Sequence, residues 1–222
     1  MRTLPTCYQP PEFKTPEILY IDDHLIVANK PPGLLSVPGR GENKKDCLIA
    51  RIQLSYPEAL VVHRLDMQTS GIMVLARNKD IQTSLSRLFE QRNIDKEYVA
   101  IVDGEILQSQ GTIDLPLITD WPNRPRQKVD FESGKSSITQ YEGIAYDSNN
   151  NSTRVKLKPV TGRSHQLRVH LLSIGHVIYG DALYADENIA GKSERLLLHA
   201  SRITFNHPIT QSVLDIESKV LF

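Results

Sequence analysis

A chain of 222 residues has room for one large domain or for two closely packed lobes, and its 40% hydrophobic content is enough to form a core. Two cysteines are too few for a disulfide framework, and no apolar run reaches the roughly 18 residues that span a bilayer, which argues against secreted disulfide-stapled and membrane-bound classes. The 26 basic residues balance 26 acidic ones, so net charge alone gives no support for a nucleic-acid partner. We expect a protein of the reducing cytoplasm.

The predicted elements follow the spacing of apolar residues and the positions of turn formers. Residues 1–16 contain four prolines and little periodicity, which predicts a loose N-terminal arm ahead of one folded domain at 17–222. Residues 18–29 indicate a hairpin that turns at Asp22 and Asp23, and Asn78 is a candidate N-cap. The other expected elements are helices at 47–55, 79–92 and from about Ser164 to Gly175, and strands at 96–103, 137–146, 153–158, 195–206 and 212–217.

The order of these elements indicates the fold class. Strands outnumber helices and do not alternate regularly with them, which is typical of a mixed α+β fold. We therefore expect a mixed, mostly antiparallel central sheet.

The run 63–72 (HRLDMQTSGI) places a base, a carboxylate, hydroxyl groups and a glycine between two apolar segments. Those segments indicate buried strands, and a polar loop pinned between buried strands is where a rigid scaffold presents reactive groups. This loop, which contains Asp66, is therefore a candidate site for a reactive group. By itself, an Arg two residues before an Asp is better explained by a solvated turn or a structural ion pair, because short motifs often match by chance.

The segment 160–172 (VTGRSHQLRVHLL) predicts a helix after its glycine, because leucines recur at helical spacing. Arg168 would lie close to His165 on that helix. Both His165 and His170 are also compatible with packing in the core, His170 above all. A zinc site has little support, since the spacing is not H-E-x-x-H and the segment offers no third ligand.

The run 96–102 (KEYVAIV) alternates as a strand does. A lone tyrosine in such a strand most often packs in the core with its hydroxyl group satisfied. The residues alone therefore leave the role of Tyr98 open.

Taken together, these segments resemble the RluA-type family of pseudouridine synthases. The HRLD signature, the GRxHQ-hydrophobic-RxH pattern and the K-x-Y-x-A strand all match, in order with the stretches 29–39 (NKPPGLLSVPG) and 196–200 (LLLHA). The resemblance implies a sheet split into two lobes with an active-site cleft, and an enzyme that isomerises uridine to pseudouridine in RNA. That isomerisation oxidises, hydrolyses and transfers nothing, so we expect neither a cofactor nor a metal.

The resemblance also implies roles for single residues. Asp66 would be the essential catalytic residue, and Arg168 would pair with its carboxylate. Tyr98 would stack on the target base, and Arg64 would contact the distorted RNA. The further RNA contacts implied are His63, Arg163 and His165.

The distribution of charge along the chain favours an RNA partner, whereas the net charge gives no support for one. No acidic residue lies between Asp147 and Asp181, whereas five basic residues do. Arg124, Arg126 and Lys128 add three positive charges within five residues. Such clusters are typical of a protein surface that contacts the phosphates of a nucleic-acid backbone. For the basic residues at 154–158, a solvated strand pair is a fair alternative.

The stretch 115–129 (LPLITDWPNRPRQKV) resembles the dual-specificity enzyme of this family. That resemblance implies two substrates, position 32 of tRNA anticodon stem-loops and position 746 of 23S rRNA. Many relatives begin with an S4 RNA-binding domain, and residues 1–16 are too short to contain one, so we expect no S4 domain here.

Three other interpretations stay open on the sequence. The first is a synthase of the same family with a single tRNA or rRNA substrate. A non-catalytic RNA-binding module would keep the basic clusters but would not need Asp66. A metal-dependent hydrolase would have to use the histidines at 63, 165, 170 and 199, whose spacing gives no support. We expect a monomer with no membrane partner.

Overall fold

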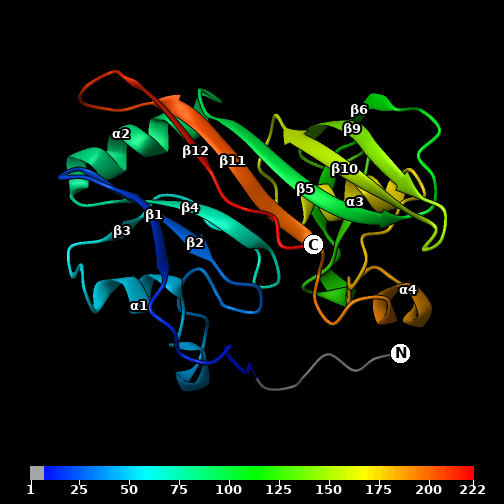
Figure 1. The fold of residues 1–222 in the computed structure, drawn as a ribbon, viewed down its shortest axis with the longest axis horizontal. Helices are drawn as coiled ribbons and strands as arrows, with labels where there is room; N and C mark the ends of the chain where they lie inside the picture. The colour runs from blue at the N-terminus through cyan, green and yellow to red at the C-terminus, as the bar shows by residue number, and fades with distance from the viewer. Residues whose placement is uncertain (1–7) are drawn as a thin grey trace. The chain divides into compact units, whose positions relative to one another are not determined.

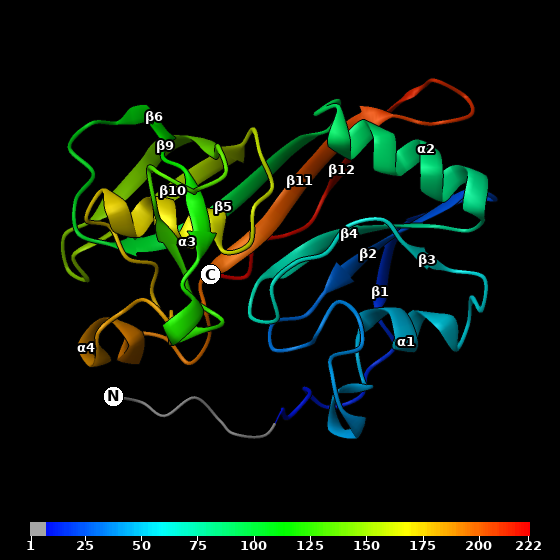
Figure 2. The same cartoon turned by 180° about the vertical axis from the view of Figure 1, so that it is seen from behind.

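The computed structural model describes residues 8–222 and divides into two compact units (Figure 1, and from behind in Figure 2). We call residues 8–96 with residues 199–222 the terminal unit, and residues 97–198 the middle unit. Each unit combines β-sheet with two α-helices, which confirms the expected α+β class. Within residues 8–222, no helix has the length and apolar character needed to cross a membrane.

The sheet of the terminal unit takes strands from both ends of the chain. Its strands are β1 (Glu17–Ile21), β2 (Leu25–Lys30), β3 (Leu60–Val61), β4 (Ser70–Ala76), β11 (Leu198–Asn206) and β12 (Val213–Glu217). β2 lies between β1 and β4 and is antiparallel to both. β4 pairs with β11 in parallel, while β3 pairs with β4 and β12 with β11 in antiparallel fashion. The hairpin expected at 18–29 is confirmed.

The core of the terminal unit lies between this sheet and α2 (Lys79–Glu90). Val27 and Val74 are fully buried and share one cluster with Leu85 of α2. The predicted cap is confirmed, because the Oδ1 atom of Asn78 accepts the Ile81 N–H at 2.9 Å. The remaining elements of this unit are a 3-10 turn (Glu42–Lys44) and α1 (Leu48–Gln53).

The middle unit is built on an antiparallel sheet in the order β5-β10-β9-β6, with a separate two-stranded ribbon. The sheet strands are β5 (Asp95–Asp103), β6 (Gln110–Asp114), β9 (Ile138–Asp147) and β10 (Ser152–Pro159). The ribbon consists of β7 (Leu117–Thr119) and β8 (Gln127–Val129), joined through a 3-10 turn (Trp121–Asn123). The helices are α3 (Gln166–Ser173) and α4 (Glu187–Gly191).

α3 packs on the sheet of the middle unit. Its Leu167 and Leu171 lie in one cluster with Ala100 and Leu157 of the sheet. The helix begins at Gln166, later than expected, because the preceding residue adopts a left-handed backbone conformation that cannot continue into a helix.

The expected loose arm is attached where the structure describes it. Its first seven residues lie outside the described residues, and residues 8–16 form neither helix nor strand. However, the Tyr8 hydroxyl group accepts the Leu35 N–H at 3.0 Å. Arg51, which is only 4% exposed, donates to the carbonyl oxygens of residues 11 and 12. These hydrogen bonds join residues 8–12 to the terminal unit, and the looseness of the whole arm stays a prediction.

Candidate active site

The residues predicted for the site are divided between the two units. His63, Arg64 and Asp66 lie in the loop between β3 and β4 of the terminal unit. Tyr98 lies on β5 and Arg168 on α3, both in the middle unit.

A buried ammonium group holds the backbone just after Asp66. Lys30, at the end of β2, is 0% exposed, and its Nζ donates to the carbonyl oxygen of Met67 at 3.0 Å. The same group donates to the carbonyls of Leu34 and Pro31, at 2.8 and 3.0 Å. A buried cation is tolerated only when its donors are satisfied, so Lys30 ties the Asp66 loop firmly to its own turn.

A buried hydroxyl group holds the backbone just before Asp66. The Oγ atom of Ser36 donates to the carbonyl oxygen of Leu65 at 2.7 Å and accepts the Leu65 N–H at 3.1 Å. Residues 65 and 67 are thus both fixed, while Asp66 between them is partly exposed. Sequence reasoning used the stretch 29–39 only as a family match and missed these two supporting side chains.

The loop ends at a close contact between two strands. Gly71 has a φ of 111°, and a Cβ atom there would lie 2.2 Å from the carbonyl oxygen of Ala200 on β11. Only glycine fits such a contact. Beside it, the His199 ring is buried between two hydroxyl groups, with Ser70 Oγ at 2.8 Å and Ser218 Oγ at 3.0 Å.

His63 is engaged inside the terminal unit. Its Nε2 atom accepts the Val74 N–H at 2.9 Å, and its ring stacks on Phe89 with the centroids 4.4 Å apart. Burial, with Lys96 nearby, lowers the pKa of His63 to about 3. The ring is therefore neutral at pH 7 and would offer no charge to a phosphate. Arg64, the next residue, is exposed.

Tyr98 packs against the apolar cluster of the middle unit. It pairs with Leu157 across β5 and β10, and its side chain contacts the cluster that contains the leucines of α3. It is partly exposed, so one side of the tyrosine is packed and another remains accessible.

Arg168 forms a buried, two-pronged ion pair with Asp181. Its Nε and Nη2 atoms donate to the two carboxylate oxygens at 2.7 and 2.6 Å, and the residues are 4% and 1% exposed. Asp181 also accepts the N–H groups of Leu183 and Tyr184. Sequence reasoning missed Asp181, whose only signal is its place in a Gly-Asp turn. The pairing of Arg168 with Asp66 remains a prediction.

The two histidines of this segment have different surroundings. His165 has a φ of 53°, and its Nδ1 atom lies 2.7 Å from the Tyr184 hydroxyl group. His170 is fully buried, with Thr139 Oγ1 at 2.9 Å and the carbonyl oxygen of Leu115 at 3.0 Å, and burial lowers its pKa. The core interpretation of His170 is confirmed.

The basic cluster at 124–128 lies on the exposed β7–β8 ribbon. Arg124 is exposed, and its guanidinium group lies 4.5 Å from the ring centroid of Trp121, itself 65% exposed. Lys128 lies 3.4 Å from a carboxylate oxygen of Asp130, in an exposed pair that contributes little. An exposed aromatic ring beside cations suits a nucleic-acid strand, because bases stack on rings and phosphates bind cations.

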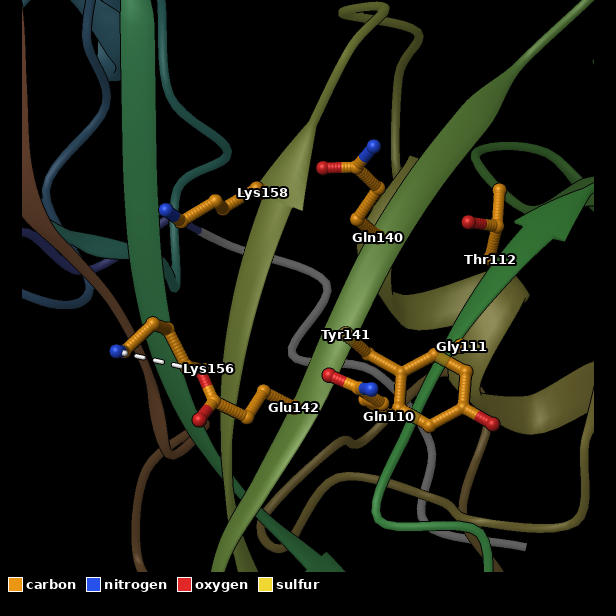
Figure 3. A pocket seen from close by; sticks show the side chains of 8 residues that line it. All are labelled: Gln110, Gly111, Thr112, Gln140, Tyr141, Glu142, Lys156 and Lys158. Atoms are coloured by element: carbon orange, nitrogen blue, oxygen red, sulfur yellow. Dashed lines mark ion pairs between the residues drawn. The ribbon is translucent and has the colours of Figure 1, made fainter.

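Both lysines of β10 are paired with acidic neighbours. Lys156 lies 3.4 Å from Glu142, as the dashed line in Figure 3 marks, and Lys158 lies 3.0 Å from Glu97. Both lysines line an open, polar depression of about 480 Å³ on the exposed face of β6, β9 and β10 (Figure 3). These pairs favour the solvated-strand alternative over a phosphate-binding role for this strand.

The four histidines proposed for a hydrolase lie in separate hydrogen-bonding environments. His63 accepts a backbone N–H, His165 meets a tyrosine, and His170 and His199 bond to hydroxyl groups. Across residues 8–222, no group of three histidine, cysteine or acidic side chains is arranged to hold a metal ion.

Comparison with known proteins places this fold and loop in one class, the enzymes that isomerise uridine in RNA. Residues 24–173 match the family model described as RNA pseudouridylate synthase. The solved structures of human RNA Pseudouridylate Synthase Domain Containing 1 and Domain Containing 4 superpose with TM-scores of 0.79 and 0.72 at 27% and 26% identity. They cover 95% and 92% of this chain, and 86% and 88% of their own.

Curated relatives are closer in sequence. The protein named Dual-specificity RNA pseudouridine synthase RluA from Escherichia coli K12 is 53% identical over 201 residues, which is 90% of this chain and 91% of the relative. Its namesake from Yersinia pestis is 52% identical over 86% of this chain and 92% of the relative. The chain therefore belongs to the RNA pseudouridine synthases, and it isomerises uridine in RNA to pseudouridine.

Proposed function

We propose that this enzyme modifies two classes of RNA, one uridine in a tRNA anticodon stem-loop (position 32) and one in a 23S rRNA hairpin (position 746). The observation that carries the proposal is the identity of 50–53% with synthases named dual-specificity, over about nine tenths of the chain. The stretch 115–129, which resembles the dual-specificity enzyme in sequence, forms the ribbon that carries Trp121 and Arg124. We further propose that the enzyme is a monomer and acts in the cytoplasm, where both RNAs occur.

Asp66 is the residue we assign to the chemistry. The reaction breaks the bond between ribose C1′ and uracil N1, turns the base, joins C1′ to C5 and releases the C5 hydrogen as a proton. One carboxylate can act as nucleophile or base and later receive the proton. A glycosidase generally needs two carboxylates because it must also activate water. Lys30 and Ser36 support this role by fixing the backbone on both sides of Asp66.

We assign to Arg168 an ion pair with the carboxylate of Asp66. A guanidinium group presents five N–H donors in a fixed plane, and Asp181 engages its Nε and Nη2 atoms. A cation held in that way can pair with a second carboxylate and orient it. Asp181 is thus the residue that sets the plane of Arg168.

The remaining residues are assigned to RNA. A base inside a stem-loop must be flipped before it can react, at a cost of a few kcal/mol. Stacking on Tyr98 offsets about 1–3 kcal/mol of that cost, and Arg64 fills the space that the base leaves. The phosphate contacts are assigned to Arg124, Arg126, Lys128 and Arg163. Uncharged contacts with the RNA loop are assigned to His63 and His165.

The substrate range is tested with two isolated hairpins. An anticodon stem-loop and a 23S hairpin of similar loop sequence are each incubated with the enzyme, and pseudouridine is mapped by carbodiimide-dependent stops of reverse transcription. We expect one modified uridine in each hairpin. The matched control is Asp66→Asn, which should give no stop in either.

Each other outcome has a defined meaning. Modification of only one hairpin would reduce the enzyme to a single-substrate synthase. Modification of intact RNA but of neither hairpin would show that recognition extends beyond the loop, and the proposal of a short shared element would fail.

A further inference from the structure

Tyr184 joins three parts of the middle unit that are far apart in sequence. Its hydroxyl oxygen accepts the N–H of Gln127 at 2.8 Å and lies 2.7 Å from His165 Nδ1. Gln127 begins β8 and stands between two of the basic residues of the ribbon. His165 immediately precedes α3. One hydroxyl group thus connects the basic ribbon to the start of the helix that carries Arg168.

The ring of Tyr184 makes a second, separate connection. The guanidinium carbon of Arg168 lies 5.0 Å from its centroid, within the range of a cation–π contact. The backbone N–H of Tyr184 donates to Asp181, the partner of that same guanidinium group. The ring and the carboxylate therefore contact Arg168 from the same short turn and together set its orientation.

The hydroxyl group also holds the ring of His165. A tyrosine hydroxyl has one proton to donate and lone pairs that accept. The hydroxyl oxygen accepts the Gln127 N–H and shares a second hydrogen bond with His165 Nδ1, in which the tautomer of the ring decides which atom donates. The left-handed backbone of His165, with a φ of 53°, is uncommon outside glycine, and this hydrogen bond helps to hold it.

We propose that Tyr184 is a positioning residue that couples the basic ribbon to Arg168 and His165. This inference rests on the proposed function, in which the ribbon binds RNA and Arg168 orients Asp66. The hydroxyl group positions the ribbon and His165, and in this way it affects RNA binding. The ring orients Arg168, and in this way it affects the chemical step. A tyrosine that only filled the core would show no such division.

Two variants of one residue separate the two roles. Tyr184→Phe removes only the hydroxyl group, so we expect KM for the RNA to rise about tenfold while kcat stays within about twofold. Tyr184→Leu also removes the ring, so we expect kcat to fall at least about tenfold in addition. Thermal unfolding of each variant shows how much folded protein is present, and ¹⁵N spectra of His165 report loss of the hydrogen bond at Nδ1 in Tyr184→Phe.

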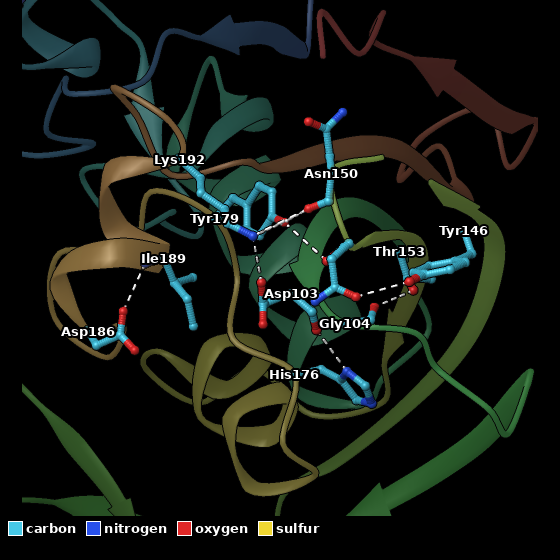
Figure 4. Close-up of polar contacts among 11 residues, drawn as sticks. Asp103, Gly104, Tyr146, Asn150, Thr153, His176, Tyr179, Asp186, Ile189 and Lys192 are labelled. Carbon is cyan, nitrogen blue, oxygen red and sulfur yellow. Dashed lines mark hydrogen bonds and ion pairs between the residues drawn. The ribbon is translucent and has the colours of Figure 1, made fainter. Parts of the chain in front are cut away.

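The matched control is Tyr179→Phe. Tyr179 is a buried tyrosine of the same unit, and its hydroxyl group donates to the carbonyl of Asn150 at 2.7 Å and accepts from Lys192 at 2.7 Å (Figure 4). It has no part in the assigned RNA or catalytic contacts. We expect Tyr179→Phe to lose stability without any change in kcat or KM of the folded protein.

The inference is overturned if Tyr184→Phe has the KM of the wild type. It is also overturned if kcat and activity fall only in proportion to the folded fraction in both Tyr184 variants. If the wild type modifies neither hairpin, the proposed substrate range fails instead. The coupling is then tested directly by RNA affinity and by amide exchange of Gln127, and unchanged values of both in Tyr184→Phe would refute it.

Discussion

The fully buried ammonium group of Lys30 donates to the backbone carbonyl of Met67, 3.0 Å away, and so anchors the residue that follows Asp66. Since a displacement of about 1 Å can cost roughly 100-fold in rate, an anchor one residue from a catalytic carboxylate bears on chemistry as well as on stability.

Replacement of Lys30 by Met keeps the length of the side chain but removes its donors. Three carbonyl oxygens would lose their partner, and we expect the free energy of unfolding to fall by about 1–3 kcal/mol. We also expect kcat to fall several fold with little change in KM. Urea unfolding and tritium-release kinetics measure the two effects. Lys45→Met, at an exposed lysine, is the control and should change stability by less than about 0.5 kcal/mol, and an equally mild Lys30→Met would refute the anchor.

Substitutions of Tyr98 separate stacking from hydroxyl chemistry. Tyr98→Phe keeps the ring face, whereas Tyr98→Ala removes it. We expect Tyr98→Ala to lose much more activity, because stacking of a base on an aromatic ring is worth about 1–3 kcal/mol. Steady-state kinetics on one hairpin substrate measure both variants. Normal activity of Tyr98→Ala would make the residue a packing residue only, and equal losses would assign the role to the hydroxyl group.

Neutralising the basic ribbon tests its assignment to RNA. With Arg124, Arg126 and Lys128 all replaced by Gln, we expect weaker binding to RNA of any sequence. The slope of log affinity against log salt should fall by about 0.7–0.9 for each lost phosphate contact. The control replaces Lys14, Lys45 and Arg202, which each lie beside an acidic side chain and should leave the slope unchanged. A slope that does not change in the ribbon variant would show that this cluster faces solvent.

The lowered pKa of His63 predicts that the stability of the protein depends on pH. The folded pKa of about 3 lies below the ordinary 6.5, so between these values the unfolded chain binds a proton that the folded protein does not. The free energy of unfolding should therefore decrease as pH falls below 6.5, by up to about 2 kcal/mol at pH 5. In His63→Gln, which can still accept the Val74 N–H, this decrease should be smaller. Urea unfolding at pH 8, 6.5 and 5 compares them, and parallel curves would contradict the assignment.

The sequence predicts the elements with strong periodicity and misses the short ones. The helix at 79–90 with its cap and the strands at 138–147 and 152–159 are confirmed. The strands β6, β7 and β8 and the helix α4 were not predicted. Each has three to five residues, too few for a pattern to repeat, and their places depend on partners distant in sequence.

The residues of the candidate site also differ in how well the sequence predicts them. Asp66, Tyr98 and Arg168 are predicted from the sequence through the resemblance to the family's motifs, because the residues alone leave their roles open. The residues that hold them give weaker signals. Asp181 and Tyr184 are recognised only when the fold brings their turn beside Arg168. The role of Lys30 is recognised only in the folded structure, where its side chain is fully buried.

The most direct test of the account is tritium release by Asp66→Asn. Transcripts labelled with tritium at uracil C5 lose the label to water only when C5 becomes bonded to ribose. We expect the wild type to release tritium in proportion to the pseudouridine formed. Asp66→Asn should release none while its affinity for the same RNA stays within a few fold of the wild type. Substantial release by the pure variant would contradict the assignment of the chemistry to Asp66.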